Sequence, residues 1–355
     1  MGEIQTITAD RLPYLTFVPQ DGRSIPVMAY LDPSHNWSLF VQRDGSFMIY
    51  HPIGAMSTTF ITSNLVLSPI DCCLPLSDFV FQYTSFDDTL QTIKAIEDDF
   101  LNSLASIHKY FVLLSYANRH RSAHPYTLVS TELEFAFGNH RSFYDLLIKL
   151  FTSLYKKLKL QKDGKPISPA SLTESFDRIL GKTDEYLAES YHFAPSIISY
   201  LRKRESVFKA LRQVRNNVNH KGHSLDRIYA TEEGFALSLD DREWSQLRTF
   251  GIWPEKSVKN NRIASILGLL VFIADDIEAA MAGLADAIKE LFVTTCGGVP
   301  QRISEGHRMC LRDDLVSHFI RLPEYRQNLW ISSNDPLESL HKEWEAVHQP
   351  TNIQG

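Results

Sequence analysis

The chain has 355 residues, which is long enough for two domains, or for one large domain with additions, and for a sizeable buried core. Hydrophobic residues make up 44% and charged residues 22%, an ordinary balance for a globular protein that excludes an intrinsically disordered chain. The net charge of −6 and the pI of about 6.1 exclude a generally basic protein that coats nucleic acid, so a contact with RNA requires a local basic patch.

Cysteine usage and hydropathy indicate a reduced, cytoplasmic setting. The adjacent Cys72 and Cys73 cannot readily bridge to each other, and no C-x2-C pair offers a zinc site, so we expect no metal and no other cofactor. Met1–Asp10 is polar and acidic and has no secretory pattern. The most apolar run, Ile263–Ala274, is too short to cross a bilayer and is expected to be part of a buried helix.

Residues 1–85 read as a β-rich module. Runs of β-branched and aromatic residues predict strands at Tyr14–Val18, Ile25–Leu31, Leu39–Gln42, Phe47–Tyr50 and Thr58–Leu67. Asp44-Gly45 between two of these strands predicts a hairpin, because Asp-Gly readily takes the positive φ angles of a tight turn.

From residue 86 the apolar period becomes helical. One long helix is predicted from Ser85 or Asp87 to about Arg119, and a second over 130–160, opened by a capping box of Thr131 and Glu134. A loop over Gln161–Pro169 and short helices near Leu172–Leu180 and Asp184–Tyr191 are expected to follow.

The strongest helical pattern lies over 196–223. One face is apolar, and the other carries six basic side chains suited to a polyanion: Arg202, Lys203, Arg204, Lys209, Arg212 and Arg215. Gly222 marks its end. A hairpin near 224–239 and a last long helix over Asn260–Phe292 come next, with Gly268 and Gly283 suited to close packing.

We therefore predict a mainly α chain with three parts. Residues 1–85 form the β-rich module, 86–292 form an antiparallel helical bundle, and 293–355 form a helical tail packed on the bundle. The tail is expected to be interrupted at Pro323, Pro336 and Pro350.

Arg215, Asn216 and His220 follow one another at the end of the 196–223 helix. This arrangement resembles the R-x4-6-H motif of the HEPN superfamily, whose members are helical bundles and include metal-independent endoribonucleases that act as toxins or antiphage effectors. The resemblance implies that Arg215 and His220 are catalytic, with Asn216 orienting the histidine or contacting phosphate. It also implies RNA as substrate, a homodimer with a composite active site, and an antitoxin or other inhibitory partner.

The residue types suit this chemistry. Metal-free RNA cleavage needs a base for the ribose 2′-hydroxyl, an acid for the leaving oxygen and a cation for the phosphorane. Histidine titrates near neutrality, and arginine stays charged and binds two phosphate oxygens at once. Candidate substrate-binding residues around the motif are Arg212, Lys221, His223, Arg141 and Asp145.

Several alternatives stay open at this point. Arg215 could pair with a carboxylate and His220 cap the helix end, and Arg141 and Asp145, four residues apart, could form a salt bridge or reach the motif. The same spacing recurs at Arg119…His124 and Arg302…His307. Asp275, Asp276 and Glu278 suggest a metal site or, more simply, an acidic exposed helix face.

Two further functional alternatives remain. The chain could be a non-catalytic HEPN-fold module that binds a nucleotide or a protein, or a plain helical scaffold. On a straight helix, positions five apart point about 140° from each other. Either the helix unwinds before His220, or Arg215 and His220 meet partners across an interface.

Overall fold

The computed structural model describes the helices, most strands and parts of their connections. The described residues are 5–8, 27–31, 37–43, 46–50, 58–62, 86–120, 125–156, 160–162, 165–167, 175–220, 228–231, 233–240, 242–296, 306–310 and 313–331.

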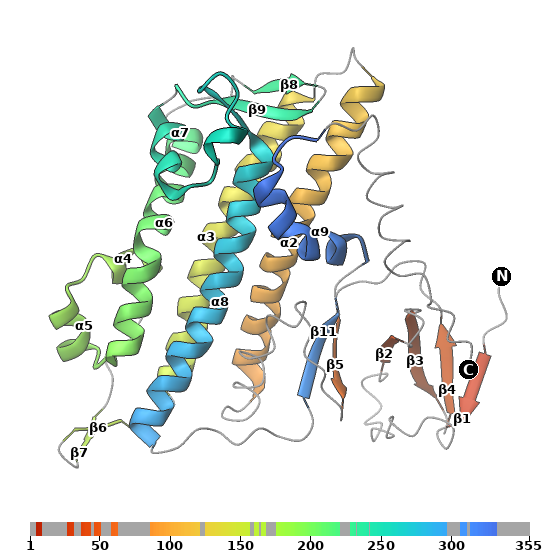
Figure 1. Ribbon diagram of the computed structural model, residues 1–355. Helices are drawn as coiled ribbons and strands as arrows, with labels where there is room; N and C mark the ends of the chain where they lie inside the picture. The colour runs from red at the N-terminus through yellow and green to blue at the C-terminus, as the bar shows by residue number, and fades with distance from the viewer. Residues whose placement is uncertain are drawn as a thin grey trace, which may run out of the picture.

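Long helices dominate the described chain, which confirms the mainly helical fold class (Figure 1). They are α2 (Phe86–Arg119), α3 (Tyr126–Lys156), α6 (Pro195–His220) and α8 (Ile266–Cys296). Two hydrogen bonds show that helices α2 and α3 are antiparallel. The Asn139 amide donates to the Asp99 carbonyl, and Glu132, which comes earlier in α3, accepts from Ser106, which comes later in α2.

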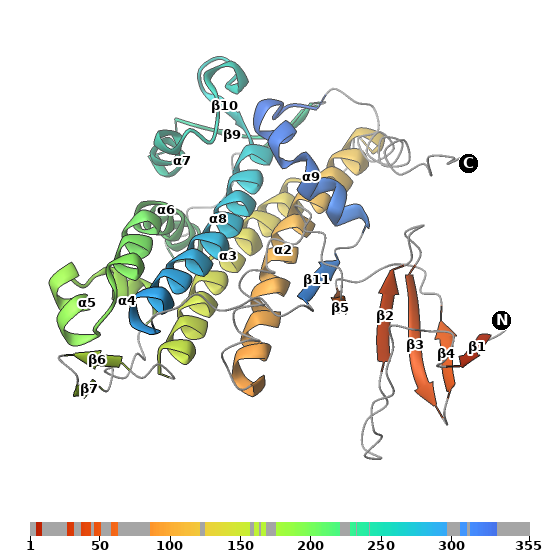
Figure 2. The ribbon, with the colours of Figure 1, turned by 60° about the horizontal axis from the view of Figure 1, so that its bottom comes forward.

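Helix α8 is the centre of the bundle. It contacts α2, α3 and α6, and Figure 2 shows it running between the other long helices. Its side chains are buried on most sides from Ile266 to Leu291, as expected for a helix that is apolar nearly all round. The burial of this one helix therefore joins the three others into a single core.

The predicted start of α3 is wrong. The helix begins at Tyr126, directly after Pro125, and the Val129 amide already donates to the Pro125 carbonyl at 2.9 Å. Thr131 lies inside the helix, where its hydroxyl donates to the Thr127 carbonyl, so it does not cap the helix. Proline has the φ angle of a helical first turn, and this favours the earlier start.

The connection between α3 and α6 contains regular structure. Its predicted short helices are α4 (Phe176–Leu180) and α5 (Asp184–Ser190). The predicted loop over 161–169 is wrong in part, because β6 (Leu160–Lys162) and β7 (Lys165–Ile167) pair as an antiparallel hairpin. Lys162 lies opposite Lys165, so only the turn-forming dipeptide Asp163-Gly164 joins the two strands.

A small sheet covers one end of the bundle. The predicted hairpin is confirmed as β8 (Tyr229–Thr231) and β9 (Gly234–Ser238), and a third strand, β10 (Ile263–Ser265), pairs with β9. This third strand was predicted as helix. The preceding Asn260 and Asn261 both have positive φ and form a turn, so α8 begins only at Ile266. Between the strands lie α7 (Arg242–Leu247) and 3-10 turns at Arg248–Phe250 and Glu255–Ser257.

The amino-terminal strands form a four-stranded antiparallel sheet in the order β1-β4-β3-β2. Its strands are β1 (Gln5–Thr8), β2 (Val27–Leu31), β3 (Trp37–Arg43) and β4 (Ser46–Tyr50). Arg43 lies opposite Ser46, which confirms the hairpin predicted at Asp44-Gly45. Strand β1 was not predicted, and the predicted strand Tyr14–Val18 lies outside the described residues.

The carboxyl-terminal part contacts both the amino-terminal strands and the helical bundle. Strand β11 (Gly306–Cys310) pairs with β5 (Thr58–Thr62), and α9 (Asp313–Gln327) packs against α2 and α8. Pro323 was predicted to interrupt the tail but lies inside α9. Contacts of Phe319 and Tyr325 with aromatic rings of α2 offset the hydrogen bond that the proline cannot make. Pro336 and Pro350 lie outside the described residues, and the predicted domain boundaries stay predictions.

Two glycines of α8 permit the close packing predicted for them. A Cβ atom on Gly268 would lie 2.9 Å from side-chain atoms of Trp253 and Leu329, and one on Gly283 would lie 3.3 Å from the Tyr200 ring. Gly138 in α3 differs, because a Cβ atom there would meet nothing within 4 Å.

This contrast gives a matched prediction. We expect Gly268→Ala to lower the free energy of unfolding by about 1–2 kcal/mol, because overpacking outweighs the gain in helix propensity. Gly138→Ala should raise it by up to about 1 kcal/mol, because the helix gains alanine without a clash. Urea unfolding of both variants measures the difference, and equal effects would contradict the packing described for Gly268.

Candidate anion-binding site between α3 and α6

Helix α6 continues without a break through the predicted catalytic motif. It runs from Pro195 to His220, so the helix does not unwind before the histidine. Position 220 therefore lies about 140° round the helix axis from position 215. Within one chain the two positions face different directions on the helix.

The basic face of α6 is mostly neutralised by ion pairs within the chain. Arg202 lies 2.7 Å from Asp184 and 3.0 Å from Glu205. Lys209 pairs with Glu205, and Arg212 lies 2.6 Å from Asp177. Within one chain the charges of the predicted polyanion-binding face are therefore largely compensated, and the polyanion contact stays a prediction.

Two arginines of α6 point into the protein on the same side. Arg204 and Arg215 are eleven residues apart, which places them about 20° from each other round the helix. The Arg204 guanidinium lies 3.2 Å from the Asp276 carboxylate. Within the described part of the chain, the buried Nε and Nη1 atoms of Arg215 have no hydrogen-bond partner. The buried Nε atom of Arg204 also has no partner there, but Arg204 forms an ion pair with a carboxylate, whereas the described residues form none with Arg215.

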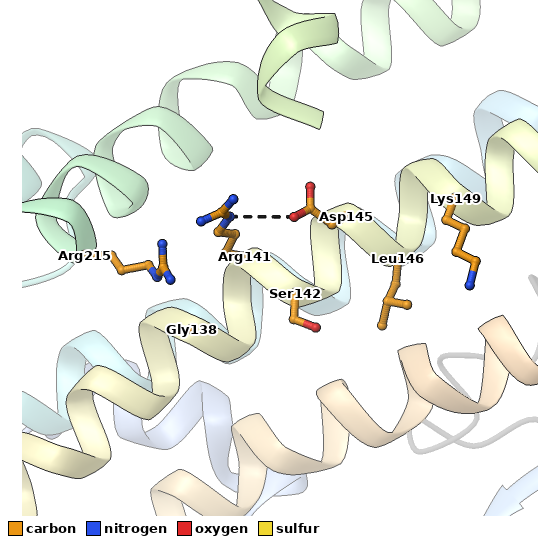
Figure 3. A pocket seen from close by; sticks show the side chains of 7 residues that line it. All are labelled: Gly138, Arg141, Ser142, Asp145, Leu146, Lys149 and Arg215. Carbon is orange, nitrogen blue, oxygen red and sulfur yellow. Dashed lines mark ion pairs between the residues drawn. The ribbon is translucent and has the colours of Figure 1, made fainter. Parts of the chain in front are cut away.

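Arg215 borders a hollow of about 410 Å³ along α3 (Figure 3). We call this the Arg215 hollow. Among the described residues its lining comes from α3 except for Arg215 itself, and consists of Gly138, Arg141, Ser142, Asp145, Leu146, Lys149 and Arg215. Three of these side chains are basic and one is acidic, so the hollow has a surplus of positive charge.

The electrostatics of Arg215 favour an anion in this hollow. Burial is the main cause that lowers the pKa of the Arg215 guanidinium, and the charges of Arg141 and Arg212 lower it further, while Asp145 acts in the opposite direction. Arginine nevertheless stays charged at neutral pH. A partly buried cation beside other cations is costly unless an anion compensates it, so the arrangement is suited to a phosphate or carboxylate ligand.

Arg141 and Asp145 fulfil both roles considered for them. They form an ion pair along α3 with 3.6 Å between the Arg141 Nε and Asp145 Oδ2 atoms, drawn as the dashed line in Figure 3. Both also line the hollow together with Arg215, which comes from another helix. The pairing of α3 with α6 thus assembles three of the residues predicted from the sequence.

The other predicted residues are not among the described lining of the hollow. Asn216 is half-buried and does not line the hollow, and Arg212 is held by Asp177. For His220 the structure gives only a place in the last turn of α6, and Lys221 and His223 lie outside the described residues. Lys149 was missed, although it lies four residues after Asp145 and so on the same side of α3.

Of the two other matches to the motif spacing, the structure describes only one residue each. Arg119 ends α2, but His124 lies outside the described residues. His307 belongs to strand β11, opposite Ile61, and Arg302 lies outside the described residues.

A buried polar network lies at the centre of the bundle. Asp276 of α8 is 5% exposed and accepts hydrogen bonds from His140 at 2.9 Å and Tyr144 at 2.7 Å, both on α3, and from Arg204 of α6. Burial acts to raise the pKa of the Asp276 carboxyl, but the bonds and charges of His140, Tyr144 and Arg204 hold it below its usual value. The acidic exposed face predicted around 275–278 is therefore wrong for Asp276.

Among the described residues, no group of three His, Cys, Asp or Glu side chains could hold a metal ion, and no helix is long and apolar enough to span a membrane. Comparison with protein-family models, curated proteins and solved structures finds no match to this chain.

The neighbouring acids Asp275 and Asp276 allow a matched test of the buried network. We expect Asp276→Asn to lower the free energy of unfolding by about 3 kcal/mol, because it leaves Arg204 buried without a charge partner. Asp275→Asn should cost less than about 1 kcal/mol, because burial raises the pKa of the Asp275 carboxyl and so offsets much of its ion pair with the half-exposed Arg326.

The pH dependence has a defined sign. Because folding lowers the pKa of Asp276, its contribution is fully present above the unfolded pKa of about 4 and is lost as the pH falls through the folded pKa. Urea unfolding of the wild type and both variants at neutral and acidic pH measures these effects. Equal losses at the two positions would contradict the assignment of Asp276 to the core.

Proposed function

We propose that the chain is a metal-independent endoribonuclease of the HEPN type, acting as a toxin or antiphage effector, in which the Arg215 hollow binds the phosphate of the cleaved bond. The observation that carries this proposal is that the buried Nε and Nη1 atoms of Arg215 have no hydrogen-bond partner among the described residues and lie beside Arg141 and Lys149. A phosphate supplies the negative charge and the acceptor oxygens that these side chains lack.

The cations suit the chemistry of RNA cleavage. Attack of the 2′-hydroxyl on the neighbouring phosphate builds negative charge on the phosphorane oxygens, and preorganised cations stabilise that charge. The proposed products carry a 2′,3′-cyclic phosphate.

The proton transfers are assigned to His220. Because positions 215 and 220 face different directions on α6, the histidine at a given hollow is proposed to come from a second copy of the chain. The active form is then a homodimer, and an antitoxin or other inhibitor is proposed to restrain it.

A second candidate function is phosphate or nucleotide binding without catalysis. The observation that favours it is again the continuous helix, which separates His220 from the hollow within one chain. In this alternative Arg215 is a ligand-binding residue, and His220 has no role in chemistry.

Cleavage of mixed RNA in excess EDTA separates the two functions. We expect Arg215→Ala to reduce cleavage at least about 100-fold through loss of phosphate stabilisation. His220→Ala should reduce it by a similar factor or more, while phosphate binding is kept. Lys203→Ala is the matched control, because Lys203 is an exposed cation of α6 away from the hollow, and it should leave cleavage unchanged.

Each outcome has a defined meaning. Cleavage by the wild type and the Lys203 variant only, with cyclic-phosphate ends, supports the nuclease. Phosphate binding that requires Arg215, with no cleavage by any variant and no toxicity on expression, supports the binding module. Cleavage that persists in Arg215→Ala contradicts the role of the hollow.

A further inference from the structure

The Arg215 hollow contains a carboxylate, which a site for phosphate alone does not need. Asp145 lines the hollow among Arg141, Lys149 and Arg215, and 39% of its side chain is exposed. A carboxylate at this place repels a bound phosphate, because like charges at short range are unfavourable. Its presence indicates a ligand that carries a hydrogen-bond donor close to its phosphate.

Asp145 keeps its capacity to accept hydrogen bonds. The Arg141 Nε atom lies 3.6 Å from Oδ2, which is an ion pair but too long for a hydrogen bond. Oδ1 receives one long bond, of 3.4 Å, from the Phe176 amide. An ionised carboxylate offers about four acceptor sites, so both oxygens can take a further donor from a ligand.

The spacing of charges matches a phosphate with a neighbouring hydroxyl. Arg141 and Asp145 are one helical turn apart, about 5–6 Å between their Cβ atoms, so a cation and an acceptor stand side by side on α3. In RNA the 2′-hydroxyl is the donor next to the 3′-phosphate, and DNA lacks it. The amine and imino groups of a base are the other donors that a nucleotide offers to a carboxylate.

We propose that Asp145 accepts a hydrogen bond from the ribose 2′-hydroxyl and thereby makes the Arg215 hollow select ribonucleotides over deoxyribonucleotides. This inference rests on the proposed phosphate site but not on catalysis. Asp145 is then a specificity-determining residue. Its charge lowers the affinity of the hollow for a phosphate alone, and its hydrogen bond raises the affinity for a phosphate that has a hydroxyl on the neighbouring carbon.

Equilibrium binding of small nucleotides tests the inference. Calorimetric titrations in EDTA compare adenosine 3′-monophosphate with 2′-deoxyadenosine 3′-monophosphate, neither of which has a leaving group for cleavage. We expect the wild type to bind the ribonucleotide roughly tenfold more tightly, as for one hydrogen bond to a charged acceptor. Uridine 3′-monophosphate as a third ligand shows whether the base contributes.

Asp145→Ala should change the two affinities in different ways. Loss of the acceptor should abolish the preference for the ribonucleotide, while loss of the negative charge should leave the affinity for the deoxynucleotide equal or higher. Asp145→Asn keeps one acceptor oxygen and should retain part of the preference. Glu134→Gln removes a charge from an exposed position of α3 outside the hollow and should change neither affinity.

The contradicting results differ from those that overturn the proposed function. Equal affinities of the wild type for both adenosine nucleotides, or an unchanged ratio in Asp145→Ala, overturn the role of Asp145 but leave the phosphate site in place. Parallel loss of both affinities in Asp145→Ala assigns the residue to structure only, and a wild-type preference set by adenine against uracil assigns it to the base. Binding of neither nucleotide by the wild type overturns both proposals.

Discussion

The Asp276 carboxylate fixes how the helices of this protein face one another. It is buried at the centre of α8 and bonded to His140 and Tyr144 of α3 and to Arg204 of α6, so one side chain sets the rotation of two neighbouring helices. Adjacent residues of a helix point about 100° apart, so Arg141 is turned away from the core once His140 faces Asp276. Arg215 shares the side of Arg204 three turns farther along α6. These two rotations determine that Arg141 of α3 and Arg215 of α6 line the same hollow.

The two inward-facing arginines of α6 show what distinguishes a structural charge from a ligand-binding one. Arg204 is matched by a carboxylate in the core, and its removal is expected to affect folding. Arg215 is directed to an open hollow where other cations surround it, and burial lowers the pKa of its guanidinium. A fold optimised for stability alone has no reason to keep such a side chain, which is why we connect it with an anionic ligand.

Hydrophobic periodicity was sufficient to predict the long helices, because each buries one apolar side over many turns. It failed where segments are short. Asp44-Gly45 was read as a hairpin because long alternating strands flank it, whereas Asp163-Gly164 lies between strands of three residues that show no alternation. The composition of Ile263–Ser265 fits a strand as well as a helix. Only the turn at Asn260 and Asn261, directly before it, shows that the segment is a strand and that α8 begins later.

The candidate site could be predicted only in part. The motif pointed to Arg215, and Arg141 with Asp145 were placed near it on the resemblance, but only its four-residue spacing from Asp145 separates Lys149 from other lysines of the chain. The neutralised charge of α6 could not be predicted either, because partners such as Asp177 and Asp184 come from other elements. Asp276 was misassigned because the acids beside it, Asp275 and Glu278, suggest an exposed acidic face.

The central claim is that Arg215 is held ready for an anion. A crystal structure of the wild-type protein grown with tungstate, a heavy analogue of phosphate, tests this most directly. We predict tungstate in the Arg215 hollow with its oxygens about 2.7–2.9 Å from the Arg215 guanidinium, as in other charge-assisted hydrogen bonds. An empty hollow, with Arg215 paired instead to a carboxylate of the chain itself, would contradict the claim.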